Sequence, residues 1–143
     1  MFVSDILSQK GGLVYSVAPE MVVAEVAKQL NARRVGSVLV LNEASSVVGI
    51  VSERDLVSAM ATHGLKALEL EAHQIMTRDV ITCDPDDSID EVMQSMTNGR
   101  FRHLPVVQRG ELLGIVSIGD VVKARLQETK HETEALKAYI VAG

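Results

Sequence analysis

Two stretches of the chain share one pattern: GIVSERD at residues 49–55 and GIVSIGD at residues 114–120. In each stretch a short apolar run ends at a serine, and an aspartate follows three residues after that serine. A short apolar run of this kind favours a buried strand. A serine followed three residues later by an acidic residue favours the start of a helix. The chain therefore contains the same strand-to-helix junction twice.

The repeat extends beyond this junction. The apolar positions of residues 19–30 match those of 85–96 at one constant offset, and 38–41 match 104–107. A single extra residue in the first hairpin turn then shifts the alignment by one. Two copies of one unit imply that neither half can bury its apolar face alone, so each packs against its twin. The repeated polar pair also indicates two equivalent sites related by pseudo-symmetry.

The bulk properties limit the class of protein. The chain has 143 residues, which is one compact unit or two very small ones that share a core. Apolar residues make up 47% and aromatic residues only 3%, so the core must consist of aliphatic side chains and methionine. The net charge of −5 argues against a general nucleic-acid binder, although a local basic cluster would suffice for a small phosphate ligand.

The termini and the cysteine content bear on location. Cys83 is the only cysteine, so no intramolecular disulfide can form, and a reducing compartment is expected. Residues 1–5 lack the basic and apolar regions of a signal peptide. No apolar stretch reaches the roughly 20 residues that span a bilayer. These features predict a cytoplasmic protein with neither membrane nor nucleic acid as a partner.

The first half of the sequence predicts five strands and helices in a definite order. A short strand at 13–17 precedes a helix at about 20–32, whose apolar residues recur with helical spacing. Strands at 37–41 and 47–51 flank a polar turn and form a hairpin. A helix at about 53–62 follows, with Gly64 as its C-cap. Residues 65–77 connect the halves, with enough apolar side chains to dock parts of that connection.

The second half repeats this order. It predicts a strand at 80–82, a helix starting at a Ser88 capping box and ending near residue 99, strands at 103–107 and 112–116, and a helix after Ser117. The last helix has no glycine or proline from Asp120 to Ile140, so it continues far beyond its counterpart. Its apolar end, Leu136, Tyr139 and Ile140, is expected to dock.

The doubled strand–helix–strand–strand–helix order, the Leu104-Pro105-Val106-Val107 run and the two GIVS-x-x-D stretches resemble the tandem cystathionine β-synthase (CBS) domain, the Bateman module. The resemblance covers residues 13–62 and 79–126. It implies an α/β (α+β) fold of two pseudo-symmetric β-α-β-β-α repeats packed through their sheets, plus an extended C-terminal helix. The predicted repeats are 1–76 and 77–143.

The repeated serine and aspartate have two compatible interpretations. Ser52 with Asp55, and Ser117 with Asp120, form helix caps that satisfy amide groups and complement the helix dipole. A helix start also presents N–H groups to a phosphate. The resemblance implies that the aspartates bind ribose and that the serines lie near phosphate.

The basic residues differ between the repeats. The resemblance implies that Arg102 and His103 direct cations at phosphates, whereas the matching positions of the first repeat are Gly36 and Ser37. That repeat instead offers Arg34 and Arg54, so the two sites should treat a phosphate chain differently. A solvated basic loop is the alternative interpretation. The remaining predicted ligand-binding residues are Ser37, Pro105, Ser16 and Thr82. The resemblance implies that Ser16 and Thr82 line the adenine side of the pocket, and the alternative is that they simply lie at strand ends.

The resemblance implies a regulatory, energy-sensing module that binds an adenosine-containing ligand in the cleft between the two repeats and signals by a change of conformation or dimer geometry. The candidate ligands that it implies are AMP, ADP, ATP, NAD(H) and S-adenosylmethionine. The module is expected to act on an unidentified protein and to form a homodimer through a face containing Val57, Met60, Val121, Val122 and Leu126. One alternative is a structural dimerisation adaptor with degenerate pockets. The other, a nucleotide hydrolase, lacks an activated nucleophile, paired carboxylates and a metal cluster, so no catalytic residue, catalytic cofactor or metal ligand is predicted.

Overall fold

The computed structural model describes residues 1–142. The chain divides into two compact units, which we describe separately. The first-repeat unit comprises residues 13–81 and 110–112, and the second-repeat unit comprises residues 1–12, 82–109 and 113–142. Residues 1–12 therefore pack with the second repeat. The repeat boundaries 1–76 and 77–143 describe the sequence pattern and remain a prediction.

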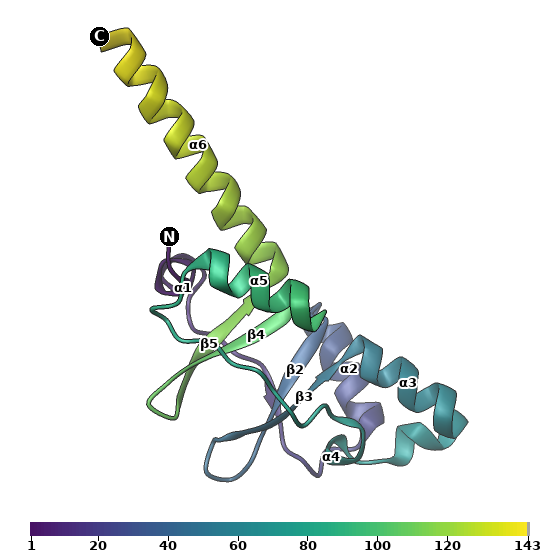
Figure 1. Cartoon of the computed structure of the whole chain (residues 1–143). Coiled ribbons are helices and arrows are strands. Elements are labelled where there is room, and N and C mark those ends of the chain that lie inside the picture. The colour runs from purple at the N-terminus through teal and green to yellow at the C-terminus, as the bar shows by residue number, and fades with distance from the viewer. Residues whose placement is uncertain (143) are drawn as a thin grey trace. The chain divides into compact units, whose positions relative to one another are not determined.

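The first-repeat unit contains a three-stranded sheet with the order β1-β2-β3 (Figure 1). Its elements are β1 (Ser16–Val17), α2 (Val23–Arg33), β2 (Ser37–Leu41), β3 (Val47–Ser52) and α3 (Glu53–His63). β1 and β2 are parallel, and β2 and β3 form the predicted antiparallel hairpin. The core is aliphatic, as predicted, and includes Val26, Leu30, Val38, Val40 and Val51.

The connection after α3 is more ordered than the sequence suggested. It forms a 3₁₀ helix, η1 (Gly64–Glu69), and a short helix, α4 (Ala72–Ile75). Gly64 is the predicted C-cap of α3, with a φ of 64°. Ile75 and Met76 pack against the core, whereas Leu68 remains 37% exposed. Thr77 exchanges backbone hydrogen bonds with Ile50 at 3.0 and 2.9 Å, which fixes the end of the connection beside β3.

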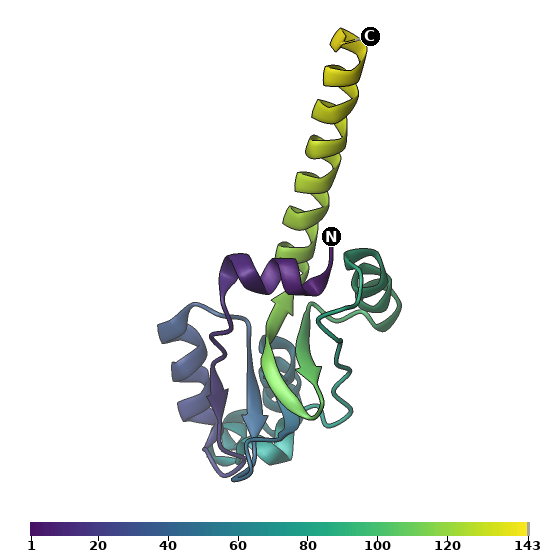
Figure 2. The same ribbon diagram turned by 90° about the vertical axis from the view of Figure 1, so that its left-hand side faces the viewer.

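The second-repeat unit contains α5 (Ile89–Gly99), a two-stranded sheet of β4 (His103–Gln108) and β5 (Glu111–Ser117), and α6 (Ile118–Ala142). Ser88 caps α5, and its hydroxyl accepts a hydrogen bond from the Glu91 amide, as predicted. The sequence did not predict α1 (Val3–Lys10). α1 lies beside the first turns of α6 (Figure 2) and buries Val3 and Ile6 in the core of this unit.

The strand predicted at 80–82 is wrong. In its place a single parallel bridge joins Cys83 to Val106, through bonds from the Cys83 amide to the Pro105 carbonyl and from the Val107 amide to the Cys83 carbonyl, both 2.9 Å. β-branched residues favour extended backbone, but a strand also needs a partner along several residues. The predicted strand 13–17 is likewise reduced to the two residues of β1.

Matching backbone contacts show the repeat directly. α2 ends at Arg34 and α5 at Arg100, both in the left-handed conformation. The first amide of α3 donates to the Gly36 carbonyl at 3.0 Å, and the first amide of α6 donates to the Arg102 carbonyl at 2.8 Å. The two acceptors are 66 residues apart and the two donors 65. This difference confirms the one-residue shift between the hairpins.

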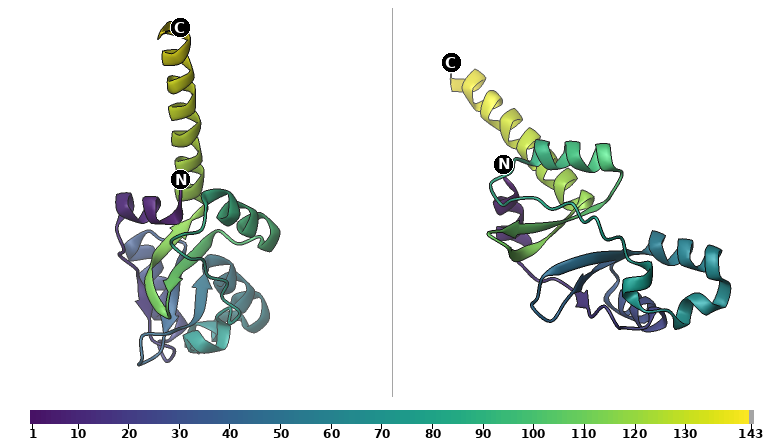
Figure 3. Two further views of the ribbon diagram at one scale, coloured as in Figure 1. Left: turned by 60° about the vertical axis from the view of Figure 1, so that its left-hand side comes forward. Right: turned by 60° about the horizontal axis from the view of Figure 1, so that its bottom comes forward.

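α6 changes character along its length. Its first turns bury Val121 and Ala124 in the core. The prediction that Val121 lies on a dimer face is therefore wrong, because this side chain is fully buried within its own unit. Beyond these turns α6 extends away from the rest of the second-repeat unit (Figures 1 and 3). Leu136, Tyr139 and Ile140 are 59%, 77% and 67% exposed, so the predicted docking of this end does not occur within the described chain.

Candidate functional site

The junction between β3 and α3 forms a complete capping box. The Asp55 amide donates to the Ser52 hydroxyl at 3.3 Å, and the Ser52 amide donates to Asp55 Oδ2 at 2.8 Å. The other carboxylate oxygen, Oδ1, accepts a hydrogen bond from the Thr77 hydroxyl at 3.1 Å. Asp55 is thus held in a fixed orientation at a helix start while remaining half-buried. The capping interpretation is correct, and the Asp55 side chain is not fully enclosed.

Ser37 provides a second polar group at the same end of the sheet. It lies opposite Ser52 in the β2–β3 register and is only 8% exposed. Its hydroxyl is buried without a hydrogen-bond partner among the described residues. Buried polar groups are nearly always hydrogen-bonded, and leaving one unsatisfied costs about 1–3 kcal/mol. A ligand could supply the missing partner.

The other predicted residues of the first repeat lie around this end. Arg54 is exposed in the first turn of α3, and Arg34 is exposed at the end of α2, three residues before β2 begins. Ser16 is exposed on β1, opposite Leu39. The structure therefore joins Ser37, Ser52 and Asp55 into one cluster. It also adds Thr77, which the sequence analysis missed.

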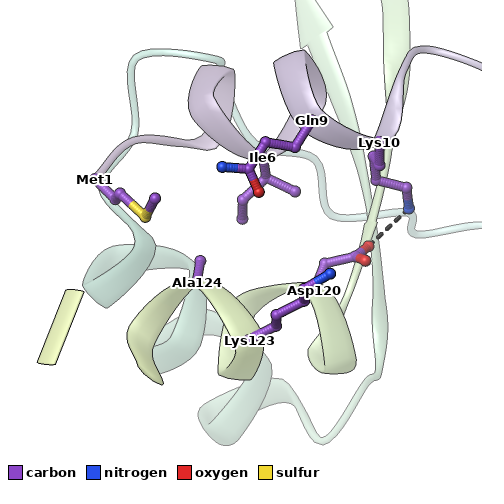
Figure 4. A pocket seen from close by; sticks show the side chains of 7 residues that line it. All are labelled: Met1, Ile6, Gln9, Lys10, Asp120, Lys123 and Ala124. Carbon is purple, nitrogen blue, oxygen red and sulfur yellow. Dashed lines mark hydrogen bonds and ion pairs between the residues drawn. The ribbon is translucent and has the colours of Figure 1, made fainter. Parts of the chain in front are cut away.

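The junction between β5 and α6 repeats the cap with a different outer partner. The Ser117 amide donates to Asp120 Oδ2 at 2.9 Å, and the Asp120 amide donates to the Ser117 hydroxyl at 3.1 Å. Lys10, at the end of α1, donates to the same Oδ2 at 2.7 Å (Figure 4). It also donates to the Ile115 carbonyl at 3.0 Å. The sequence analysis missed Lys10, since only the docking of α1 brings it here.

Lys10 changes the electrostatics of Asp120. Burial alone would raise the pKa of this carboxyl, but hydrogen bonds from Lys10 and Ser117 and the positive charge of Lys10 outweigh it. The net result is a pKa below the ordinary value, so Asp120 is ionised at neutral pH. The outer partner of Asp55 is the neutral Thr77 hydroxyl, whereas that of Asp120 is a cation. The two repeats thus present chemically different carboxylates.

A pocket of about 120 Å³ opens beside Asp120 (Figure 4). Sites that enclose a drug-sized ligand usually measure about 300–1,000 Å³, so this pocket is too small for a whole nucleotide. Two lysines, Lys10 and Lys123, contribute to its wall, which makes it compatible with an anionic group. The other lining residues are Met1, Ile6, Gln9, Asp120 and Ala124.

The basic positions of the second repeat lie at the start of β4. Arg102 is exposed, and its carbonyl accepts the first amide of α6. His103 is half-buried as the first residue of β4. This backbone contact brings the Arg102 backbone to the start of α6, beside Ser117. Pro105 is buried and bonded through its carbonyl to Cys83, and Thr82 is exposed beside that cysteine.

Comparison with known proteins gives this geometry a family context. The model of the CBS domain matches residues 3–62 and 72–127. The chain belongs to the CBS-domain family. It is 32% identical over 149 residues to the mitochondrial CBS domain-containing protein CBSX3 of Arabidopsis thaliana, covering 99% of this chain and 72% of that protein.

Solved CBS structures agree with the fold. A CBS-domain containing protein from Agrobacterium tumefaciens has 45% identity and a TM-score of 0.85, covering 87% of this chain and 92% of its own. CBSX2 in complex with AMP has 25% identity and a TM-score of 0.75, covering 90% and 98%. A CBS domain pair with 5′-methylthioadenosine and S-adenosyl-L-methionine has 28% identity and a TM-score of 0.75, covering 91% and 98%.

Cys83, the single cysteine of this CBS pair, is buried. Burial, with a smaller effect of Asp87 and Asp84, raises the pKa of the Cys83 thiol to about 12, so the thiol stays protonated at neutral pH and is a poor nucleophile. Within residues 1–142, no group of three or more His, Cys, Asp or Glu side chains is arranged to hold a metal ion. In the same residues, no helix is both long and apolar enough to cross a bilayer.

Proposed function

We propose that this CBS pair is a regulatory module that binds an adenosine-containing nucleotide. The ribose hydroxyls bind Asp55 or Asp120, and the phosphates lie towards Arg54, Arg102 and His103. One observation carries the proposal: in both repeats a backbone amide at a helix start holds a half-buried carboxylate in place. Such a carboxylate accepts hydrogen bonds from vicinal hydroxyls, and helix-start amides favour phosphate.

Two further observations support this proposal. The hydroxyl of Ser37 is buried beside Ser52 and has no hydrogen-bond partner among the described residues. A polar group of the ligand would supply this hydrogen bond and so remove the free-energy cost of the unsatisfied hydroxyl. CBS pairs of similar fold have been crystallised with AMP and with 5′-methylthioadenosine and S-adenosyl-L-methionine, so adenosine-containing ligands are compatible with this architecture. The candidates are AMP, ADP, ATP, NAD(H) and S-adenosylmethionine.

The mechanism of signalling is equilibrium binding without chemistry. A nucleotide that binds one conformation of a homodimer better than another shifts the population towards the first by its differential affinity. A partner protein then responds to the favoured conformation, which would make this chain an energy sensor. We propose a cytoplasmic location because the chain has a single cysteine and so cannot form an intramolecular disulfide; the Arabidopsis relative is named mitochondrial.

A thermal-shift panel tests ligand recognition. AMP, ADP, ATP, NAD, NADH and S-adenosylmethionine are compared with UMP as the pyrimidine control. A ligand at 100 times its dissociation constant stabilises the native state by about 2.7 kcal/mol, which is a visible rise in Tm. Adenine ligands should raise Tm clearly more than UMP does. Equal shifts from AMP and UMP would show that phosphate alone is recognised.

Substitution of the aspartates tests the site. Asp120→Asn and Asp55→Asn keep the side-chain shape but remove charge from hydrogen bonds worth about 1.5–3 kcal/mol. Nucleotide affinity should fall at least tenfold at the occupied site, while stability without ligand changes by about 1 kcal/mol or less. Asp86→Asn, on an exposed turn, is the matched control. Arg102→Ala should weaken phosphate-bearing ligands but leave adenosine binding little changed.

The second candidate function is a dimerisation adaptor with degenerate pockets. The capping boxes favour it, since capping alone accounts for Ser52, Asp55, Ser117 and Asp120. An adaptor would show no thermal shift with any nucleotide, and both aspartate variants would then affect stability only. This outcome would replace the nucleotide-sensor proposal.

A further inference from the structure

The exposed length of α6 carries a regular stripe of apolar and threonine side chains. Successive members are separated by 4, 3, 4, 3 and 4 residues, which is the a/d spacing of a coiled coil. The aliphatic members are strongly exposed: Leu126 is 66%, Leu136 59% and Ile140 67% accessible. The members of this stripe, which we call the α6 seam, are Val122, Leu126, Thr129, Thr133, Leu136 and Ile140.

The seam is separate from the face that holds α6 on its own unit. That inner face consists of Val121 and Ala124, which are buried, and Glu128, which is half-buried. At 100° per residue, Leu126 lies more than a third of a turn around the helix from Val121. The packing of α6 on its unit therefore leaves the seam uncovered. A row of exposed aliphatic side chains along one helix face indicates an interaction surface.

The charges beside the seam select both the partner and its direction. With Leu126 at position a, the e positions are Lys123, Lys130 and Lys137, and Glu132 occupies a g position. In a parallel pair, g of one helix faces the next e of the other, so Glu132 meets Lys137 of a second copy in both directions. In an antiparallel pair the e positions face each other, and lysine would oppose lysine.

Arg125, the other charged g residue, is already neutralised within its own chain. Its guanidinium lies 3.1 Å from Asp90 and 3.2 Å from Glu128. In a parallel pair Arg125 would face Lys130 of the second copy, and the positive charge of Arg125 is already compensated by Asp90 and Glu128. The charge pattern is self-complementary in one orientation only, which favours a second copy of this chain over an unrelated helix.

We propose that residues 126–140 of α6 pair in parallel with the same segment of a second copy, as a short two-stranded coiled coil along the α6 seam. The segment is about two heptads long and contains two threonines, so the pairing is weak by itself. It strengthens association in combination with other contacts between the copies. It does not depend on nucleotide binding.

Disulfide trapping in the full chain tests this geometry. In a parallel pair Leu136 faces its own counterpart, so Leu136→Cys should form a covalent dimer under mild oxidation. Ala138→Cys, exposed at an f position away from the seam, is the matched control and should form little. Native Cys83 is buried and should not interfere. Neither site is packed in the core, so both variants should fold.

The direction of pairing is tested by mixing variants. In a mixture of Leu126→Cys and Leu136→Cys chains, a parallel pair gives 126–126 and 136–136 dimers, whereas an antiparallel pair gives mainly 126–136 dimers, and mass spectrometry separates them. A dominant 126–136 product, or equal dimer yields from Leu136→Cys and Ala138→Cys, would overturn the proposal. The proposal would also be overturned if the wild-type chain floated with anionic lipid vesicles and the Leu136→Asp variant did not.

A charge swap provides the independent test. Glu132→Lys should reduce the dimer yield of the Leu136→Cys chain severalfold, because it places lysine opposite lysine. Adding Lys137→Glu to that variant restores an opposite-charge pair between copies and should restore the yield. Residues 132 and 137 are five apart and do not face each other on one helix, so rescue reports contact between two chains. Failure of the rescue would refute the parallel register.

Discussion

The ion pair between Lys10 and Asp120 should contribute measurably to stability. Lys10 Nζ lies 2.7 Å from Asp120 Oδ2 and 3.0 Å from the Ile115 carbonyl, and the two side chains are 32% and 25% exposed. Exposed pairs contribute about 0.2–1 kcal/mol. A typical intramolecular hydrogen bond adds about 1 kcal/mol, and we use this value because Lys10 is partly exposed to water. Lys10→Met should therefore lower the free energy of unfolding by about 1–2 kcal/mol.

The pair itself is isolated by a double-mutant cycle. Urea unfolding at pH 7 is measured for the wild type, Lys10→Met, Asp120→Asn and the double variant. We expect a coupling free energy of about 0.5–1 kcal/mol, because each single variant removes the same ion pair. Lys28→Met, an exposed lysine on α2, is the control and should leave stability within about 0.5 kcal/mol.

The coupling must also depend on pH in a defined direction. Burial acts to raise the pKa of Asp120, but the Lys10 and Ser117 hydrogen bonds lower it below the ordinary value of 3.8. A depressed carboxyl pKa contributes stability above 3.8, and that contribution is lost as the pH falls through the folded-state pKa. Coupling should persist at pH 5 and fade as the pH falls below 3.8 and through the folded-state pKa. Zero coupling at pH 7, or coupling unchanged in acid, would refute the reasoning.

Three further predictions concern other parts of the molecule. Ser37→Ala should leave the free energy of unfolding unchanged or raise it, because it removes an unsatisfied buried hydroxyl. The same variant should weaken AMP binding in calorimetry. A decrease in the free energy of unfolding of more than about 1 kcal/mol would show that the hydroxyl has a structural partner. Gly12→Ala should destabilise by about 1–3 kcal/mol in urea, since its Cβ would lie 2.7 Å from the Leu113 carbonyl oxygen, and unchanged stability would contradict this close contact. The chain should be a homodimer by light scattering, with Val57→Asp on the exposed face of α3 shifting it towards monomer; a monomeric wild type at micromolar concentration would disprove the prediction.

The elements with strong local signals could be predicted from the sequence. The β2–β3 hairpin, α3 with its Ser52 cap and Gly64 end, and the start of α5 all depend on residues within a few positions of one another. The α1 helix and the absence of a strand at 80–82 could not be predicted in this way. α1 is stabilised by burying Val3 and Ile6 in a core formed with residues more than 75 positions away, and strand pairing requires a distant partner.

For the candidate site as well, the local features were predictable from the sequence and the contacts from distant residues were not. The repeated GIVS-x-x-D pattern determined the CBS fold, the two caps and the two candidate ribose carboxylates, because a cap is local chemistry of four consecutive residues. Only the tertiary structure decided what else touches those carboxylates: Thr77 for Asp55 and Lys10 for Asp120. Both partners come from outside the local motif. A short sequence pattern does not predict which distant residues the fold brings to it. The two sites therefore share a sequence pattern but differ in charge.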